Sequence, residues 1–194
     1  MAKKVRDSPG GADRTGMTTI PPLALSPSLR AAGVSLRPVG GADLPFLRRL
    51  YRLARWDEFA AAAWPDAMKA AFLDGQFELQ RRAHAADHPD GEFYLVSHGE
   101  TPIGRLYVDR SGPDLELLEI SLLPEWRGKG LGGGFLALLQ DTARADRRQR
   151  IRLSVRPANP ARRLYRRMGF VEAEPAARLE AAYLDMVWPA PTSS

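Results

Sequence analysis

The sequence predicts an α/β (α+β) domain built on a mixed, mostly antiparallel sheet with helices on both faces. Three features indicate this class. Residues 93–97, 103–109 and 115–123 have the composition of strands, and only tight turns separate them, so they form an antiparallel meander. Segments with apolar side chains at helical spacing flank the meander on both sides. A glycine-rich stretch joins the third of these strands to a helix.

The chain of 194 residues has the length of one domain. Residues 1–32 are rich in Gly, Pro, Ser and charged residues and lack periodicity, so we expect a disordered basic N-terminal segment. The domain itself is expected over residues 33–189, and residues 190–194 are expected to form a disordered tail.

Ahead of the meander we expect one strand and two helices. Residues 34–39 alternate as a strand does, and Asp43 precedes a helical stripe as its N-cap. Residues 55–65 form a short loop or broken helix, and Pro65 opens a second helix that runs to about residue 87. His84 and His88 stand four residues apart on this helix, but no third ligand is evident, so we expect no metal.

The stretch EISLLPEWRGKGLGGG, residues 119–134, is where the chemistry is expected. Its glycines leave little side-chain bulk over the loop, so backbone N–H groups can approach a ligand closely. The following helix directs the positive end of its dipole to the same place, and Arg127 and Lys129 add positive charge. Such a loop binds phosphate groups.

Two known phosphate loops fit this stretch poorly. A Walker A loop requires Ser or Thr after the lysine, and Lys129 is followed by Gly130. The spacing of Gly128, Gly130 and Gly133 matches the dinucleotide fingerprint, but that fingerprint belongs to the first βαβ unit of a parallel sheet. Here an antiparallel meander precedes the loop, and the next strand, residues 151–155, leads into an arginine.

Beyond the loop we expect a helix up to about residue 146 and a short strand over residues 151–155. Asn159 caps a further helix that ends before Gly169. Residues 170–173 and 179–188 are predicted to form a final hairpin.

Two blocks of the sequence resemble the GNAT superfamily of acyl-CoA N-acyltransferases. Residues 127–132, RGKGLG, have the form Arg-x-x-Gly-x-Gly of that family's pyrophosphate loop. Residues 159–170, NPARRLYRRMGF, resemble its downstream block of Asn, Tyr and Gly-Phe. The resemblance covers about residues 34–188, and it implies an acetyl-CoA-dependent N-acetyltransferase that uses no metal and transfers the acetyl group directly to a primary amine.

The resemblance also implies the residues that contact the cofactor. The pyrophosphate is expected on Arg127, Gly128, Lys129, Gly130, Leu131 and Gly132. The pantetheine arm is expected along the backbone of Leu122 and Leu123, with a further contact from Asn159. Tyr165 matches the tyrosine that faces the CoA sulfur, so it is the expected proton donor to the leaving thiolate.

A proton acceptor for the amine is expected on the strand ahead of the loop. Glu119 stands among Leu118, Ile120 and other apolar residues, where burial would raise its pKa toward that of a useful base. Glu116 is a second candidate, placed by simple alternation on the opposite face of the strand, and water alone is a third option. On the preceding strand Arg105, Tyr107 and Asp109 share a face and are candidates to contact the acceptor.

Composition narrows the remaining choices. Without cysteine there is no disulfide, thiolate nucleophile or zinc–thiolate site. No apolar run is long enough to span a membrane, and the start does not have the pattern of a signal peptide, so we expect a cytoplasmic protein. The net charge is +5, which could indicate a nucleic-acid partner, but the sequence contains no nucleic-acid-binding motif. We therefore expect that nucleic acid is not a partner.

Three function classes remain open after this reasoning. The first is an acetyltransferase for a small-molecule or peptide amine, in a family where homodimers are common. The second is a catalytically idle acyl-CoA-binding or sensor module of the same fold. The third is an NAD(P)-binding oxidoreductase.

Overall fold

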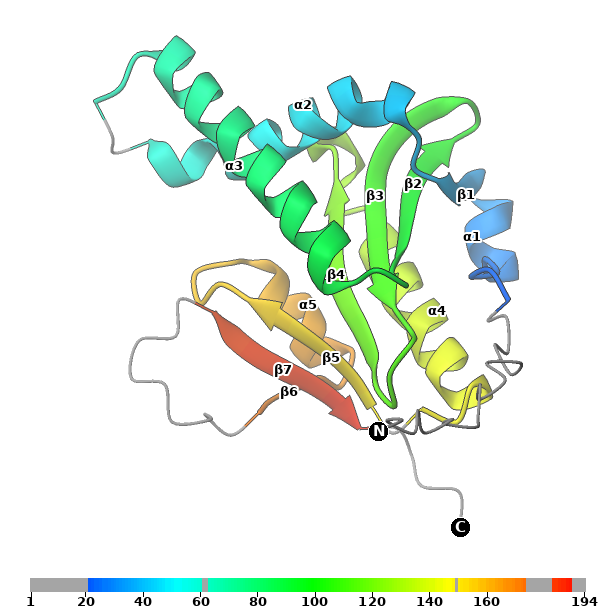
Figure 1. Ribbon diagram of the computed structural model, residues 1–194. Helices are drawn as coiled ribbons and strands as arrows, with labels where there is room; N and C mark the ends of the chain where they lie inside the picture. The colour runs from blue at the N-terminus through cyan, green and yellow to red at the C-terminus, as the bar shows by residue number, and fades with distance from the viewer. Residues whose placement is uncertain (1–20, 61–62, 149, 174–182, 190–194) are drawn as a thin grey trace, which may run out of the picture.

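The computed structural model describes residues 21–60, 63–148, 150–173 and 183–189, and within them a seven-stranded sheet forms the centre of the molecule (Figure 1). Its strand order is β1-β2-β3-β4-β5-β7-β6. All neighbouring pairs are antiparallel except β4 and β5, which run parallel. The strands are β1 (Val34–Pro38), β2 (Glu92–His98), β3 (Thr101–Asp109), β4 (Leu115–Leu122), β5 (Arg150–Val155), β6 (Val171–Glu172) and β7 (Leu184–Pro189).

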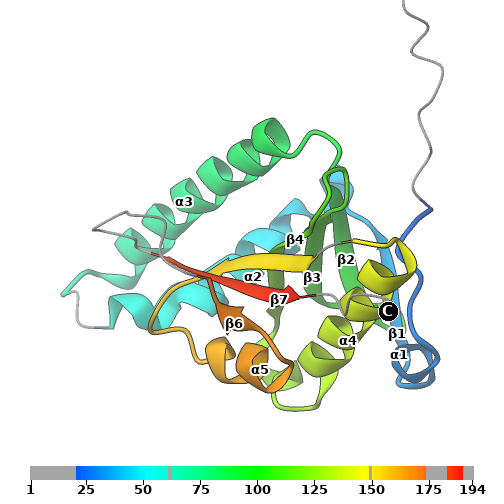
Figure 2. The ribbon, with the colours of Figure 1, turned by 90° about the horizontal axis from the view of Figure 1, so that it is seen from below.

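Helices cover both faces of the sheet, as Figure 2 shows. One face carries α2 (Leu44–Arg55) and α3 (Asp66–Asp87), and the other carries α1 (Pro27–Ala31), α4 (Leu131–Ala145) and α5 (Ala161–Arg167). Short 3₁₀ turns are η1 (Gly41–Asp43), η2 (Trp56–Phe59) and η3 (Pro124–Trp126). The mixed, mostly antiparallel sheet with helices on both faces confirms the predicted fold class.

Each face of the sheet has its own apolar core. The larger core lies under α4 and contains Phe135, Leu139 and Phe170 together with the inward side chains of the central strands. The smaller core joins α2 and α3 to the sheet through Leu47, Phe77 and other buried residues. The sheet is therefore buried on both sides, and a charged side chain on either face must find a partner.

Residues 21–32 do not match the disordered segment that the composition predicts. They include α1, and Leu23 and Leu29 are buried in the larger core. The N–H of Leu23 also donates to the hydroxyl of Tyr94 at 3.0 Å. The prediction of disorder was wrong for residues 21–32 because Leu23 and Leu29 are too few to show a periodicity in the sequence. Both side chains are nevertheless buried in the larger core. Residues 1–20 and 190–194 lie outside the described residues, as does most of the first half of the predicted final hairpin strand at 179–188.

The two halves of the sheet separate at its only parallel pair among the described strands. β4 and β5 are paired only at Leu115–Leu117 with Ile151–Leu153, although both strands continue further. Beyond this point they diverge, and β4 also carries a β-bulge, because Tyr107 pairs with Glu119 while Val108 pairs with Leu117. Leu118 is the extra residue. This divergence opens the sheet next to the glycine loop.

Candidate active site

A cleft of about 170 Å³ lies where β4 and β5 diverge, and it is lined by residues from six elements of the fold. Glu119 and Ser121 reach it from β4, Arg156 follows β5, and Tyr165 comes from α5. Asn159 lines the same cleft. The structure thus places both predicted catalytic residues, and one predicted cofactor contact, around a single space.

Glu119 is held by three side chains. Its Oε1 lies 3.0 Å from Nη2 of Arg105 and accepts a hydrogen bond from the hydroxyl of Ser121 at 2.7 Å. Its Oε2 accepts a hydrogen bond from the amide of Gln80 on α3 at 3.0 Å. The same Arg105 nitrogen donates to Oε1 of Gln80 at 3.2 Å. The carboxylate is therefore fixed in one orientation at the wall of the cleft.

These partners reverse the shift that burial alone predicts for Glu119. Burial acts to raise the pKa of the carboxyl, but the charge of Arg105, the hydrogen bond from Ser121 and the more distant charge of Arg55 together hold this pKa below its ordinary value. The sequence-based expectation of a raised pKa is therefore wrong in direction. The reason is that Arg105, buried on the neighbouring strand, was not identified as the partner of Glu119.

The relation between Glu116 and Glu119 also differs from the expectation of opposite faces. Asp109 pairs with Glu116 and Tyr107 pairs with Glu119, and paired residues point to the same side of a sheet. The bulge at Leu118 shifts the alternation by one residue, so both carboxylates lie on the face under α2 and α3. Glu116 does not line the cleft.

Tyr165 lies on the opposite wall and is almost fully buried. Burial, and to a smaller extent the negative charge of Glu119, raise the pKa of its phenol to about 12. Its ring packs against Phe170 with centroids 5.9 Å apart. The phenol is therefore protonated throughout the neutral range and available as a hydrogen-bond donor.

Two glycines of the loop have a left-handed backbone conformation. Gly128 and Gly130 have φ angles of +72° and +82°, which side chains rarely adopt, and a Cβ at either would meet nothing within 4 Å. The first helical hydrogen bond of α4 runs from the N–H of Gly134 to the carbonyl of Gly130. The N–H groups of Leu131 and Gly132 precede it, so they project from the helix terminus.

The charged side chains of this loop have local contacts. Nε of Arg127 donates to the carbonyl oxygen of Leu122 at 2.9 Å, which ties the loop to the end of β4. The ammonium of Lys129 lies 4.8 Å from the ring centre of Trp126. Both contacts leave further donor N–H groups on these side chains for an anion.

Two of the three glycines at the start of α4, Gly132 and Gly134, have a packing reason. A Cβ on Gly134 would lie 2.9 Å from Cδ2 of Leu29, and one on Gly132 would lie 3.0 Å from Cδ2 of Leu164. Gly134 therefore lets α1 approach α4 closely, whereas a Cβ on Gly133 would find its nearest atom at 3.9 Å.

Of the remaining predicted contacts, Asn159 lines the cleft, whereas Leu122 and Leu123 follow its lining residue Ser121. Leu122 and Leu123 are buried at the end of β4, and the N–H of Leu123 donates to the carbonyl of Ile103 at 2.9 Å. Oδ1 of Asn159 accepts from the N–H of Ala161, the first residue of α5, at 2.9 Å, but the N-cap position itself is held by Pro160, one residue later than predicted.

Sequence reasoning did not identify several residues of the cleft. Glu58 of η2 lines it and forms an ion pair with Arg156. Gln80 joins α3 to the Glu119 network, and Tyr183 lies next to Arg156, with its hydroxyl 3.5 Å from Nε. For Glu58 the sequence offers one local signal, since it is a charged residue within the predicted broken helix. Gln80 and Tyr183 offer none, because their contacts join parts of the chain that are far apart in sequence.

Within the described ranges no group of three or more His, Cys, Asp or Glu side chains is arranged to hold a metal ion. His88 instead contacts Asp109, with Nδ1 2.8 Å from Oδ2. No helix among the described residues is long and apolar enough to cross a membrane.

Comparison with protein families gives one match that covers most of the domain. Residues 47–170 match the model described as the acetyltransferase (GNAT) family. A comparison with curated protein sequences finds no significant match.

Solved structures of similar fold include several acetyltransferases. The PaiA N-acetyltransferase of Thermoplasma acidophilum, in complex with coenzyme A, is 18% identical with a TM-score of 0.60, covering 80% of this chain and 98% of that one. The ribosomal-protein-S18-alanine N-acetyltransferase of Escherichia coli is 17% identical with a TM-score of 0.55, covering 83% and 96%. A spermidine N-acetyltransferase SpeG chimera from Vibrio cholerae and hSSAT is 21% identical with a TM-score of 0.55, covering 81% and 96%.

Proposed function

The chain belongs to the acetyltransferase (GNAT) family, and we propose that it transfers an acetyl group from acetyl-CoA to a primary amine by direct attack, with Glu119 and Tyr165 as its catalytic residues. The observation that carries this proposal is their convergence. Glu119 on β4 and Tyr165 on α5 face one cleft, at the place where the sheet opens beside the glycine loop.

The glycine loop fits the pyrophosphate of the cofactor. Gly128 and Gly130 have open space where a side chain would stand, and the N-terminus of the 15-residue helix α4 presents free N–H groups and positive dipole charge. We assign the pyrophosphate to residues 127–132. Beyond the last residue pair between β4 and β5, the unpaired edge of β4 can form backbone contacts with the pantetheine arm along Leu122 and Leu123. Asn159 lines the adjoining cleft and is assigned to the same arm. Acetyl-CoA supplies the activated acyl group as a thioester.

Glu119 acts on the acceptor amine, which is protonated in solution with a pKa near ~10. Its lowered pKa means that the carboxylate is charged at neutral pH, so it attracts the ammonium group and accepts a hydrogen bond from a water beside it. Because this carboxylate is a weaker base than an unpaired one, it orients the water that carries the proton to solvent and does not store the proton itself. Glu116 does not line the cleft and is the weaker candidate.

Tyr165 acts on the leaving group. When the amine nitrogen bonds to the acyl carbon and the carbon–sulfur bond breaks, negative charge develops on the sulfur. The neutral phenol donates a hydrogen bond to this charge. Glu119 and Tyr165 thus serve opposite ends of the same displacement.

Two alternatives predict different measurements. An idle acyl-CoA-binding module would bind the cofactor, show no turnover with any amine and be indifferent to Tyr165→Phe. An NAD(P)-dependent enzyme would bind NADP and not CoA. The acceptor, which we place among small-molecule or peptide primary amines, is not specified further by the cleft. We also propose that the protein is located in the cytoplasm and that it forms a homodimer.

The deciding experiment is calorimetric titration of the full chain with acetyl-CoA, CoA and NADP in parallel. Micromolar binding of the two CoA species and not of NADP is the expected result, and an acetylation screen against a library of amines then identifies the acceptor class. Binding of NADP alone would overturn the proposal.

A further inference from the structure

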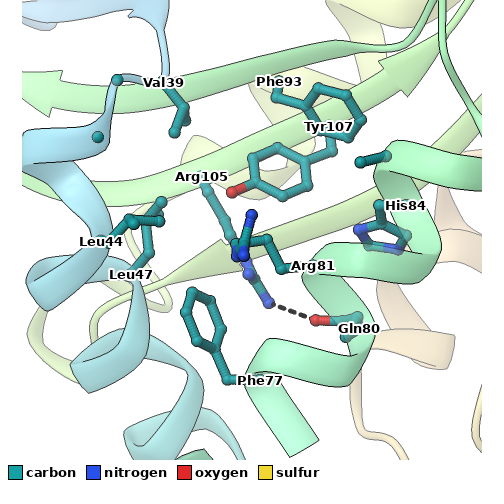
Figure 3. Close-up of a pocket in the computed structure, with 13 residues that line it drawn as sticks. Val39, Leu44, Leu47, Phe77, Gln80, Arg81, His84, Phe93, Arg105 and Tyr107 are labelled. Carbon is teal, nitrogen blue, oxygen red and sulfur yellow. Dashed lines mark hydrogen bonds between the residues drawn. The ribbon is translucent and has the colours of Figure 1, made fainter.

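A second and larger cavity lies between α2, α3 and the sheet, away from the diverging strands. Its volume is about 290 Å³. Figure 3 shows the side chains of Arg105, Arg81 and His84 reaching it from β3 and α3, below the rings of Phe93 and Tyr107. Leu47, Phe77, Gln80 and Ala85 also line it.

Arg105 brings a fixed positive charge to this cavity. The residue is only 2% exposed, and its guanidinium carbon lies 5.2 Å from the ring centre of Tyr107 and 5.8 Å from that of Tyr51. Its Nη2 contacts Glu119 and Gln80, but its Nε is buried without a hydrogen-bond partner among the described residues. The Nε atom is closed to a ligand, but Arg105 still lines the cavity, so the positive charge of its guanidinium favours an anion there.

The other polar groups of the cavity also favour an anion. Arg81 is 45% exposed and stands where the cavity meets solvent, held by Glu78 at 3.0 Å. Burial is the largest of the effects that hold the pKa of His84 below its ordinary value, so this imidazole is neutral at pH 7. No carboxylate is among the residues that line the cavity, which makes it unsuitable for an ammonium group.

The walls around these groups are apolar. Leu47 and Phe77 belong to the smaller core, and Phe93 packs edge-on against Tyr107 with centroids 5.0 Å apart. An apolar cavity of roughly 150 Å³ is sufficient for benzene. A volume of about 290 Å³ therefore has room for one ring or a branched aliphatic group together with a short acidic chain.

We propose that this cavity binds a small monocarboxylate with an apolar body, whose carboxylate lies beside the guanidinium group of Arg105 and whose body lies against Phe77, Leu47 and Phe93. Such a ligand is attracted by the charge of Arg105 and Arg81 and fills the apolar part of the space.

The site is separate from the transfer cleft. Gln80 and the Arg105–Glu119 pair form the wall between the two spaces, and Gln80 lines both. The reacting amine is expected beside Glu119, because the cavity itself offers only cationic or neutral groups. A carboxylate in the cavity is therefore an additional ligand, bound behind the catalytic network.

The experiment is calorimetric titration of the full chain with 3-phenylpropionate, its neutral amide and the corresponding amine. The acid should bind, the amide at least tenfold more weakly, and the amine not measurably. Ala85→Trp places an indole at the mouth of the cavity from an exposed position on α3, and should weaken binding of the acid at least tenfold. Ala83→Trp is the matched control, because Ala83 is exposed on the same helix but does not line the cavity.

The result distinguishes this proposal from the proposed function. Acetyl-CoA binding by both variants verifies that they are folded and that the transfer cleft is intact. Equal affinity for acid and amide, an acid affinity that Ala85→Trp leaves unchanged, or loss of acid binding in the presence of saturating CoA would each overturn the cavity assignment. None of these outcomes affects the assignment of the glycine loop.

Discussion

Tyr165→Phe removes one hydroxyl from the cleft and leaves the buried ring in place, so it tests the proposed donor directly. A phenol with a pKa of about 12 cannot readily protonate a thiolate, because a free thiol titrates near ~8.5 and the transfer is uphill by several pK units. The tyrosine is therefore expected to stabilise the developing thiolate through a charge-assisted hydrogen bond. Such a bond contributes about 1.5–3 kcal/mol, which corresponds to a fall in kcat of roughly ten- to 150-fold.

The assay is release of free CoA thiol from acetyl-CoA with an amine found in the acceptor screen. Tyr183→Phe is the matched control: this tyrosine lines the same cleft, is 44% exposed, and should change kcat less than about threefold. Calorimetry should give the same acetyl-CoA affinity for both variants and the unmodified chain. An unchanged kcat for Tyr165→Phe would remove this residue from the mechanism. A loss of about 10⁴-fold would show that full proton transfer occurs and that the argument from its raised pKa is wrong.

Four further substitutions test Glu119 and the glycines of the loop and of the start of α4. Glu119→Gln should lower kcat by about 10²-fold or more at similar acetyl-CoA affinity, and should destabilise the fold by about 2 kcal/mol because Arg105 loses its partner. The pKa of Glu119 is lower in the folded than in the unfolded chain, so its carboxylate stabilises the fold fully above the unfolded pKa of about 4.3. This stabilisation is lost as the pH falls through the folded pKa. Urea titrations should therefore show the stability difference between Glu119→Gln and the unmodified chain shrinking below about pH 4. Gly133→Ala should raise the free energy of unfolding by up to about 1 kcal/mol through helix propensity. Gly134→Ala should be at least about 1 kcal/mol less stable than Gly133→Ala, because its Cβ meets a buried leucine of α1. Equal unfolding midpoints of the two variants would contradict this packing. Gly130→Ala should cost about 1–2 kcal/mol from its left-handed backbone and weaken CoA binding in calorimetry, and unaltered binding would argue against the loop assignment.

The predictions that the structure confirms depend on residues close together in the chain. The strand meander and the two helices ahead of it follow from patterns among residues that are close together in the chain. The positive φ angles of Gly128 and Gly130 are likewise consistent with the loop motif. Local geometry determines whether a short segment forms a strand, a helix or a tight turn, so its sequence carries that information.

The features that sequence reasoning missed depend on residues far apart in the chain. The bulge at Leu118 places Glu116 and Glu119 on one face, and it is visible only in the register between β3 and β4. Leu29 is buried because the helix it belongs to packs on α4 at Gly134, more than a hundred residues later in the chain.

The same division applies to the site. The sequence by itself determined that a carboxylate stands in an apolar strand, that a basic glycine-rich loop follows it and that a tyrosine lies downstream. Only the tertiary structure decided that Arg105 pairs with Glu119, which turns the expected rise in the pKa of that carboxyl into a fall. Burial of a charge can be read from its apolar neighbours along the strand. The sign of the resulting pKa shift depends on which opposite charge the register of the sheet places within a few ångströms.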